Sequence, residues 1–248
     1  MAIKSKFALK IRDYVHTPER KREYNEQHFS EAARHYDFAT RVMSLGRDLT
    51  WKRQLVAALP RFPAPVCVDL ACGTGDVTLL LADKYPAGRV VGIDLTEPML
   101  AVARQRTRAA NVEFLKQDMA ATGLPDEFAD IVTGSYAVRN APELRQAFAE
   151  IHRILRPGGF VALLDFSKSP KPWMQKLQLL VLKYWCGLWG LILHRNPEVH
   201  SYIAASLKSF PDRTQLSNLL QECGFAISHS KRFYLGTLEL LVLQKPGA

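Results

Sequence analysis

The segment V-C-V-D-L-A-C-G-T-G-D, residues 66–76, constrains this chain more than any other stretch. Its first part has the pattern of a short buried strand and carries Asp69 near its end. Gly73 and Gly75 follow, and a helix pattern begins directly after them. Glycine at both positions allows a sharp turn and lets a ligand lie against bare main chain. The N–H groups at the start of the next helix would face such a ligand.

A second strand makes this pattern more specific. Residues 89–95 (R-V-V-G-I-D-L) are typical of a buried strand that ends in Asp94, where doubly wound nucleotide-binding folds hold a ribose. A dinucleotide site would require a third glycine at position 78, but Thr78 stands there. Asp76 would also repel a pyrophosphate. The pattern therefore predicts a nucleoside that lacks phosphates and carries positive charge, a description that fits S-adenosylmethionine.

Strands and helices alternate through the rest of the chain, which predicts a parallel sheet with helices on both faces. The last two strands are separated only by a Leu-Gly turn, so they must pair antiparallel. We expect strands near 66–70, 89–94, 112–116, 129–135, 159–166, 225–234 and 237–244, and helices near 76–85, 97–109, 142–155 and 214–222. The predicted fold class is α/β, with a doubly wound, Rossmann-like sheet of seven strands that is mostly parallel and has one antiparallel strand.

Two segments lie outside this alternation. Residues 25–60 have a helical pattern, and we expect residues 1–60 to form an N-terminal helical cap on a domain at 61–248. Residues 173–193 contain three tryptophans and only two charges, one of which, Lys183, argues against a membrane span. Two interpretations of a helical insertion at 173–200 stay open. It is either a buried helix or a hydrophobic lid over a lipophilic substrate that also touches the bilayer.

The net charge of +9 is distributed unevenly. Residues 1–60 and 171–248 each carry +5, whereas residues 61–170 carry −1. Basic flanks suit a membrane surface or nucleic acid, but solvated faces explain them equally well. The four cysteines lack metal or disulfide spacing, so we predict no metal site and reduced thiols. The N-terminal residues lack the apolar core of a signal peptide, which indicates a cytoplasmic protein, with contact to the inner face of the membrane left open.

Several ordered motifs are more specific than the glycine turn. They are Y-D (36–37), M-S-L-G (43–46), W-K-R (51–53), D-L-A-C-G-T-G-D (69–76), D-M (118–119), R-N (139–140), L-R-P-G-G-F…L-D-F-S (155–167) and Y-I-A-A-S-L-K-S-F-P (202–211). In these motifs the chain resembles the ubiquinone/menaquinone C-methyltransferase family over residues 28–245. The resemblance implies a class I methyltransferase fold, S-adenosylmethionine as cofactor, and methylation on carbon of a lipophilic acceptor, a prenylated hydroquinone or quinone precursor.

The resemblance also implies roles for residues of the cofactor site. Thr74 and the main chain of the glycine turn would face the methionine part, and Asp94 would bind both ribose hydroxyls. Asp118 and Met119 would contact the adenine, and Ser135 would lie beside the sulfonium. The cofactor-binding residues that we predict are Asp69, Gly73, Thr74, Gly75, Asp94, Asp118, Met119 and Ser135.

Arg139 and Asn140 are the predicted catalytic residues. Methylation on carbon requires an ionised ring hydroxyl, and phenols ionise near pH 10. A fixed cation lowers that pKa, and Arg139 stays protonated, so it would hold the phenolate rather than act as a base. Asn140 would position a water that takes the proton. His194 and His200 are further candidates for the base.

The chain departs from the family pattern on the expected substrate side. F-A-T-R (38–41) stands where the family usually has M-N-D after Y-D, and Gly46-Arg47-Asp48 stands where it often has G-x-H-R before W-K. Ala137-Val138 precedes R-N in place of G-L. A small-molecule C- or O-methyltransferase of secondary metabolism therefore stays open, as do a non-enzymatic SAM- or quinone-binding protein and a homodimer. Nucleic acid is not an expected partner, because S-Y-A-V-R-N stands at 135–140 where base-amino methyltransferases carry N/D-P-P-Y/F.

Overall fold

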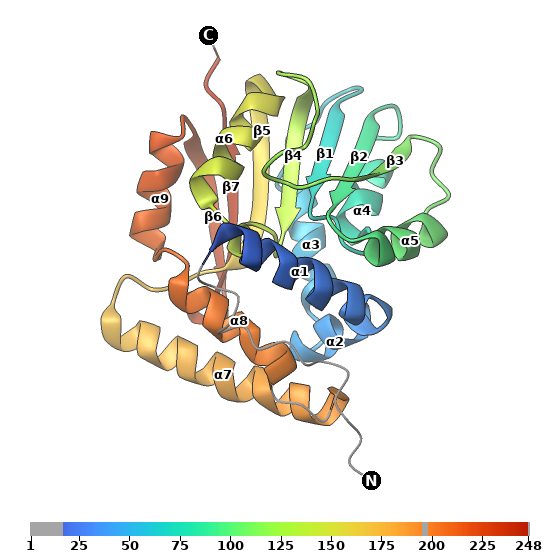
Figure 1. Cartoon of the computed structure of the whole chain (residues 1–248). Helices are drawn as coiled ribbons and strands as arrows, with labels where there is room; N and C mark the ends of the chain where they lie inside the picture. The colour runs from blue at the N-terminus through green and yellow to red at the C-terminus, as the bar shows by residue number, and fades with distance from the viewer. Residues whose placement is uncertain (1–16, 195–197, 248) are drawn as a thin grey trace.

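A computed structural model describes residues 17–194 and 198–247. In this part of the chain, seven strands form one sheet in the order β3-β2-β1-β4-β5-β7-β6 (Figure 1). The strands are β1 Val66–Leu70, β2 Arg89–Asp94, β3 Val112–Lys116, β4 Ala129–Ser135, β5 Leu155–Phe166, β6 Ala226–Phe233 and β7 Leu238–Gln244. All seven expected strands are present, and the predicted fold class is confirmed.

The strand order explains where a ligand would bind. The chain runs from β1 outward to β3 and then returns to the other side of β1, at β4. Such a switch point opens a crevice at the carboxyl ends of the strands. β7 pairs antiparallel with both β5 and β6, so it is the expected antiparallel strand. β5 begins earlier than expected because Leu155 already pairs with Ala129, ahead of an irregularity in the register.

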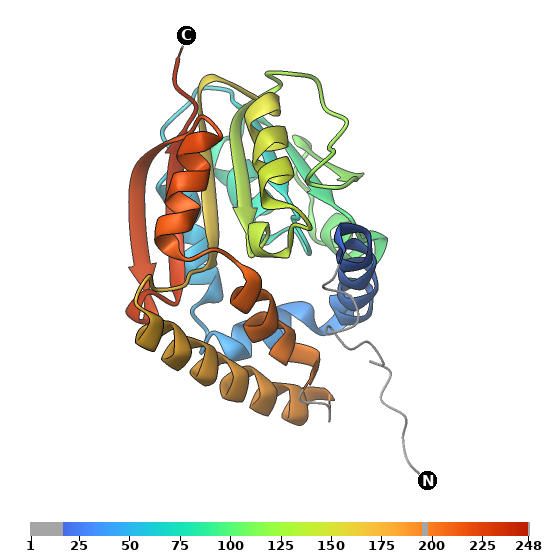
Figure 2. The same ribbon diagram turned by 60° about the vertical axis from the view of Figure 1, so that its left-hand side comes forward.

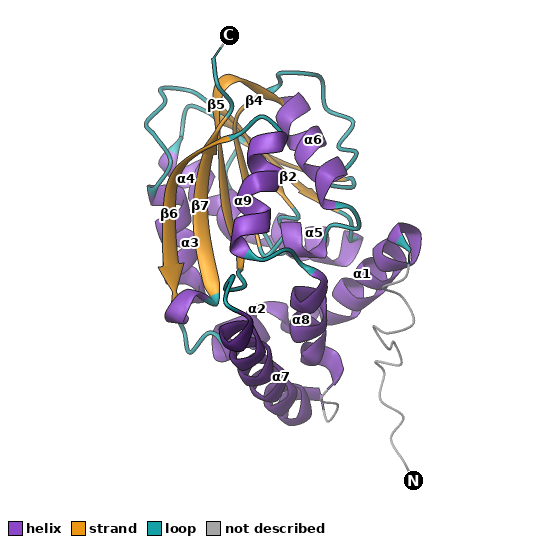
Figure 3. Cartoon of the chain, turned by 90° about the vertical axis from the view of Figure 1, so that its left-hand side faces the viewer, coloured by secondary structure: helices purple, strands orange, loops and turns teal. Residues whose placement is uncertain are grey.

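Helices cover both faces of the sheet (Figures 2 and 3). The α-helices are α1 Pro18–Ala32, α2 Tyr36–Met43, α3 Asp48–Ala57, α4 Asp76–Lys84, α5 Glu97–Arg106, α6 Leu144–Ile154, α7 Pro172–His194, α8 Glu198–Ser209 and α9 Arg213–Glu222. Helices α6 and α9 pack on one face, and α3 and α4 pack on the other. Along β1, Val68 and Leu70 enter the first of these cores and Cys67 enters the second, as the alternation of a strand requires.

Local sequence explains where several helices begin. The Thr17 side chain accepts the N–H of Arg20 at the start of α1. Asp212 and Gln215 form a capping box at the start of α9, in which each side chain bonds the other residue's main chain. α4 begins differently, since its capping residue is Gly75 in the left-handed conformation. The first N–H groups of α4, which follow the glycine turn, are therefore left without a side-chain cap.

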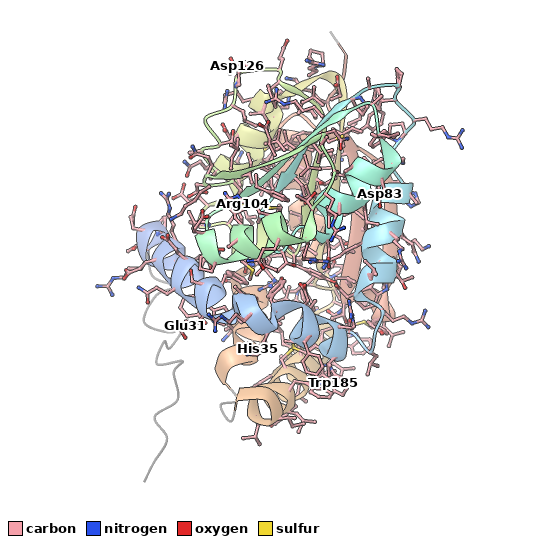
Figure 4. All side chains as sticks on the ribbon, turned by 90° about the vertical axis from the view of Figure 1, so that its right-hand side faces the viewer. Glu31, His35, Asp83, Arg104, Asp126 and Trp185 are labelled. Carbon is pink, nitrogen blue, oxygen red and sulfur yellow. The ribbon has the colours of Figure 1, made fainter. Side chains whose placement is uncertain are left out.

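Helices α1, α2, α7 and α8 gather at the carboxyl edge of the sheet, below the strands in Figure 1. Trp185, labelled in Figure 4, lies on α7. Its indole N–H donates to the carbonyl of Met43 at the end of α2, with a distance of 3.0 Å. This bond joins two helices that lie far apart in the sequence. The crevice at the switch point is therefore covered by helices from two distant segments of the chain, α1 and α2 in one and α7 and α8 in the other.

The expected helical cap at 1–60 is formed, in its described part, by α1 and α2. α3 packs beside α4 on a face of the sheet instead, and residues 1–16 lie outside the described residues. The division at residue 60 stays a prediction. The segment at 173–193 is helical, within α7, as expected. Across 17–194 and 198–247, no helix combines the length and hydrophobicity needed to cross a membrane.

Candidate functional site

The glycine turn after β1 has the geometry that its sequence indicates. Gly73 and Gly75 have φ values of 56° and 87°, a region that favours glycine. A Cβ on Gly75 would lie 3.2 Å from the Cβ of Ala103 on α5, so a larger residue there would also crowd the neighbouring helix. The turn is therefore closely packed and exposes its main chain.

Asp94 anchors this turn to the end of β2. Its Oδ2 accepts the N–H of Gly73 at 2.8 Å, and its Oδ1 accepts the main-chain and side-chain donors of Thr96 at 2.9 and 2.6 Å. Burial raises the pKa of the Asp94 carboxyl, while these hydrogen bonds act in the opposite direction. Asp94 has a structural role in the turn and also faces the cavity beside it.

A cofactor cavity lies at the switch point and brings most of the predicted residues together. Of these, Gly73, Asp94, Asp118, Met119, Ser135 and Asn140 line it. Its wall also contains residues that the sequence motifs did not indicate, chiefly Arg22, Asn25 and Phe29 of α1, with Thr96 and Met99 at the start of α5. No local signal marks the α1 residues, because they reach the site only through the folding of α1 over the sheet. Arg22 pairs with Asp118 at 3.1 Å.

The side chains that line this cavity suit a nucleoside. A carboxylate at the end of β2 matches ribose hydroxyls, and the Met99 and Met119 side chains offer an apolar wall for a base. The free volume is only about 80 Å³, whereas sites for molecules of this size usually enclose a few hundred Å³. Because α1 supplies one wall, we expect α1 to move outward when a nucleoside enters.

Asp69, in contrast, does not line the cavity. Its two carboxylate oxygens accept the hydroxyls of Thr78 on α4 and Thr133 on β4, each at 2.7 Å. Burial raises its pKa to about 6, and the two threonines oppose that rise. Asp69 therefore links β1 to α4 and to β4. This geometry does not support our prediction that Asp69 contacts the cofactor directly.

Thr74 and Gly75 also lie outside the cavity wall. The Thr74 hydroxyl donates to Oδ1 of Asp37, at the start of α2, at 2.5 Å. Arg106 of α5 donates to Oδ2 of Asp37 and to the Thr74 carbonyl, at 3.0 and 2.9 Å, and also pairs with Asp76. Asp37 of the cap thus occupies the Thr74 hydroxyl, the group that we predict to face the methionine part of the cofactor. Contact between Thr74 and the cofactor would require the hydrogen bond from Thr74 to Asp37 to break.

An apolar acceptor cavity of about 670 Å³ adjoins the cofactor cavity, between α1 and α2 on one side and α7 and α8 on the other. Its lining is mainly aromatic and aliphatic, including Phe29, Met43, Trp51, Phe166, Leu182 and Trp185. Trp173, Leu177 and Val181 of α7 line it and are also more than half exposed. The cavity therefore reaches the surface along α7.

Arg139 lines the acceptor cavity and is almost completely buried. Its guanidinium lies 3.5 Å from a carboxylate oxygen of Asp165, donates to the hydroxyl of Ser206, and stacks over the rings of Phe166 and Tyr202. Burial acts to lower its pKa, but Tyr202 and Asp165 raise it overall, so the group remains charged. Nε has no hydrogen-bond partner among the described residues.

Phe29, Tyr36 and Tyr136 line both cavities and form the wall between them. Any group passed from one cavity to the other must cross this wall. Asn140 lies on the cofactor side, where its amide donates to the Tyr136 carbonyl at 3.0 Å. The side chains of His194 and His200, the alternative bases, lie outside the described residues.

Comparison with known proteins identifies the family to which this chain belongs. Residues 18–241 match the model of the ubiE/COQ5 methyltransferase family. The chain belongs to this family. It is 34% identical to a demethylmenaquinone methyltransferase of Thermus thermophilus, with 81% of this chain and 92% of that protein covered. It is 30% identical to a ubiquinone/menaquinone biosynthesis C-methyltransferase of Desulfotalea psychrophila, covering 86% and 87%.

Solved structures show the same fold. An S-adenosylmethionine-dependent methyltransferase from Mesorhizobium loti superposes with a TM-score of 0.58 at 18% identity, covering 77% of this chain and 95% of that one. The family member described here is accordingly a methyltransferase of class I fold with S-adenosylmethionine as its cofactor.

Replacing Asp94 with alanine tests the cofactor cavity. Loss of a charged hydrogen-bond acceptor costs about 1.5–3 kcal/mol, so the affinity for S-adenosylmethionine should fall roughly 10- to 100-fold in calorimetry. The melting temperature should fall too, because the Gly73 and Thr96 donors lose their acceptor. Asp130→Ala is the matched control, since Asp130 accepts the Val66 N–H at the opposite edge of the sheet. Unchanged affinity in Asp94→Ala would remove Asp94 from the cofactor site.

Proposed function

We propose that this methyltransferase acts on a ring carbon of a prenylated hydroquinone. The observation that carries the proposal is the apolar cavity of about 670 Å³, which meets the cofactor cavity at one wall and has a single buried cation, Arg139, among its described lining residues. An isoprenoid tail suits such a lining, and a ring hydroxyl suits the cation. The names of the relatives from Thermus thermophilus and Desulfotalea psychrophila support a quinone precursor.

The residues of the cofactor cavity would bind and orient the cofactor. Asp94 would accept the ribose hydroxyls, Asp118 and Met119 would hold the base, and Ser135 would lie near the transferred group. The cofactor, when bound, supplies an electrophilic methyl group. Catalysis then depends on holding the acceptor carbon in line with that group, which removes much of the entropic cost of the encounter.

Arg139 would stabilise the ionised acceptor. A cation held in an apolar cavity interacts strongly with a developing phenolate, because water does not screen it. Its ion pair with Asp165 fixes the guanidinium plane against the cavity wall. Asn140 would hold Tyr136, a residue of the wall between the two cavities, in place through the hydrogen bond from its amide to the Tyr136 carbonyl.

The exposed face of α7 gives this cavity a route to a membrane. Trp173, Leu177, Leu180, Val181, Tyr184, Leu188, Leu191 and Ile192 are all about half exposed or more. Contiguous apolar surface of this kind marks an interaction site in most proteins. Three of these residues also line the acceptor cavity, and the lysines of α7, Lys176 and Lys183, suit anionic headgroups. We propose that α7 rests on a lipid surface and receives the acceptor's tail from it.

Incubation with ¹³C-methyl S-adenosylmethionine and a prenylated demethyl-naphthohydroquinone tests the function. We expect one methyl group on a ring carbon, identified by its carbon chemical shift. A methoxy product would support the small-molecule O-methyltransferase alternative, which no structural observation favours at present. Cofactor binding without transfer to any hydroquinone would instead indicate a binding protein.

Leu180→Ser combined with Leu188→Ser tests membrane contact, because both residues are exposed and neither lines the cavity. Burial of a leucine side chain is worth about 1.5–3 kcal/mol, so binding to anionic vesicles should fall at least about 10-fold in flotation assays. Rates with a tail-less acceptor should not change. Asn218→Ser with Gln221→Ser, on the exposed side of α9, is the control. Vesicle binding equal to the control would contradict the proposal, and loss of self-association instead would assign α7 to a homodimer.

Replacing Arg139 with glutamine should lower turnover by roughly 100- to 1,000-fold while cofactor affinity persists. The defect should shrink as the pH approaches the acceptor's own pKa, near 10, where the ring ionises unaided. Arg139→Lys should restore part of the rate. An unpaired buried Asp165 costs about 3–5 kcal/mol, so Arg139→Gln with Asp165→Asn provides a folded comparison. A defect that does not change with pH would exclude this role.

A further inference from the structure

Tyr136 has the most unusual position in the wall between the cavities. It follows β4 directly and has a φ of 56°, a left-handed conformation that is costly for a residue with a side chain. Its N–H donates to the Leu164 carbonyl at 2.7 Å, and its carbonyl accepts the Asn140 amide at 3.0 Å. The surrounding structure thus holds Tyr136 in a strained conformation in which its ring faces both cavities.

The hydroxyl of Tyr136 belongs to a buried hydrogen-bond network that contains three charged groups, Asp48, Lys52 and Asp76. It donates to Oδ1 of Asp48 at 2.9 Å. The Lys52 ammonium donates to Oδ2 of Asp48 at 2.8 Å and to Asp76 at 3.0 Å. Asp48 and Lys52 are almost completely buried, whereas Ser44, which accepts the N–H of Asp48, lines the acceptor cavity. A carboxylate is therefore hydrogen-bonded to the hydroxyl of a tyrosine that lines the acceptor cavity.

We propose that Tyr136 and Asp48 form a proton relay that accepts the proton of the acceptor's hydroxyl group. This inference rests on the proposed function, since it requires an acceptor with an ionisable ring hydroxyl. It supplies a base for which Arg139, permanently charged, is unsuited.

The proton movements balance in the following way. The acceptor O–H bond breaks and its proton passes to the Tyr136 oxygen, while the original Tyr136 proton passes to Oδ1 of Asp48. The electron pair left on the acceptor oxygen is delocalised to the ortho ring carbon. That carbon would form the new bond to the methyl carbon as the bond between the methyl carbon and the sulfonium sulfur breaks, with the electron pair of the broken bond left on sulfur. Rearomatisation releases the proton of that ring carbon to water. Asp48 then returns its proton through Tyr136 to the ring oxygen, so one proton leaves for each methyl group transferred.

The electrostatics of the neighbouring groups suit a concerted relay. Burial, and then the Asp48 carboxylate, raise the pKa of Tyr136 well above its usual value, so Tyr136 stays neutral and transmits a proton without becoming a phenolate. Burial acts to lower the pKa of Lys52, but Asp48 and Asp76 raise it overall. Lys52 therefore remains a cation, and its ammonium donates to Oδ2 of Asp48 while the Tyr136 hydroxyl donates to Oδ1.

Groups on every adjoining element face this pair, and a pH profile must be read with all of them. They are Lys52 on α3, Tyr36 on α2, Asp76 on α4, Asp165 on β5 and Arg139 after β4. Because several of these interact, the shape of a pH profile does not isolate the relay. Acceptors of graded acidity do isolate it, since only the acceptor's own proton changes along the series.

The experiment compares wild type with Tyr136→Phe on tail-less 1,4-naphthohydroquinones whose hydroxyl pKa is lowered stepwise by electron-withdrawing groups. Rates are measured anaerobically with saturating cofactor and acceptor. General base catalysis contributes about 10²- to 10⁴-fold, so we expect a loss of about 100-fold for acceptors that ionise near pH 10. The loss should fall to a few-fold for the most acidic acceptors. KM and the calorimetric affinity for S-adenosylmethionine should be unchanged.

Tyr85→Phe is the matched control, because it removes a tyrosine hydroxyl that donates to the Pro60 carbonyl at 2.6 Å, away from both cavities. Asp48→Asn keeps an acceptor for the Tyr136 hydroxyl but cannot take the proton, so it should reproduce the graded defect. A loss that is the same for every acceptor, or no loss at all, would overturn the relay while leaving the proposed function intact. Wild type that methylates none of the hydroquinones would overturn the proposed function itself.

Discussion

A single buried ammonium group, that of Lys52, connects the two halves of this site. A buried cation is tolerated only when carboxylates compensate for its lost hydration, and Lys52 has two of them, Asp48 and Asp76. Asp48 continues to Tyr136 at the acceptor wall. Asp76 is at the start of α4, directly after the glycine turn, and continues to Arg106 and the cap. Removing the charge of Lys52 would therefore loosen the acceptor wall, the cofactor turn and the cap together.

The cap and the sheet make different contributions to function. The sheet fixes Asp94 at the end of β2 and Ser135 and Tyr136 at the end of β4, on either side of β1, where little movement is expected. The cap closes the cofactor cavity to about 80 Å³ and occupies the Thr74 hydroxyl through Asp37. Entry of the cofactor must therefore displace α1 and α2, which also line the acceptor cavity. Binding in one cavity should consequently change the shape of the other.

The sequence predicted the sheet well because its information is local. Alternating apolar residues and glycine turns determined all seven strands, and the Leu-Gly turn identified the antiparallel β7. Asp94 was predicted from its place at a strand end and Ser135 from the family resemblance, and the structure brings both to the cofactor cavity. Asp69 has the same kind of position, but two threonine hydroxyls, one of them 64 residues away, occupy its carboxylate. Partnerships such as Tyr136 with Asp48, or Thr74 with Asp37, depend on packing between distant segments, which no local motif records.

The central claim is that the two cavities meet at Tyr36 and Tyr136, so that the acceptor ring reacts across this wall. A crystal structure with S-adenosylhomocysteine and a tail-less naphthohydroquinone tests it most directly. We predict that the ring lies against Tyr136, with one hydroxyl within hydrogen-bond distance of the Tyr136 oxygen and the ortho carbon facing the cofactor sulfur. A ring bound elsewhere in the acceptor cavity, with its reactive carbon turned away from the cofactor, would contradict the account.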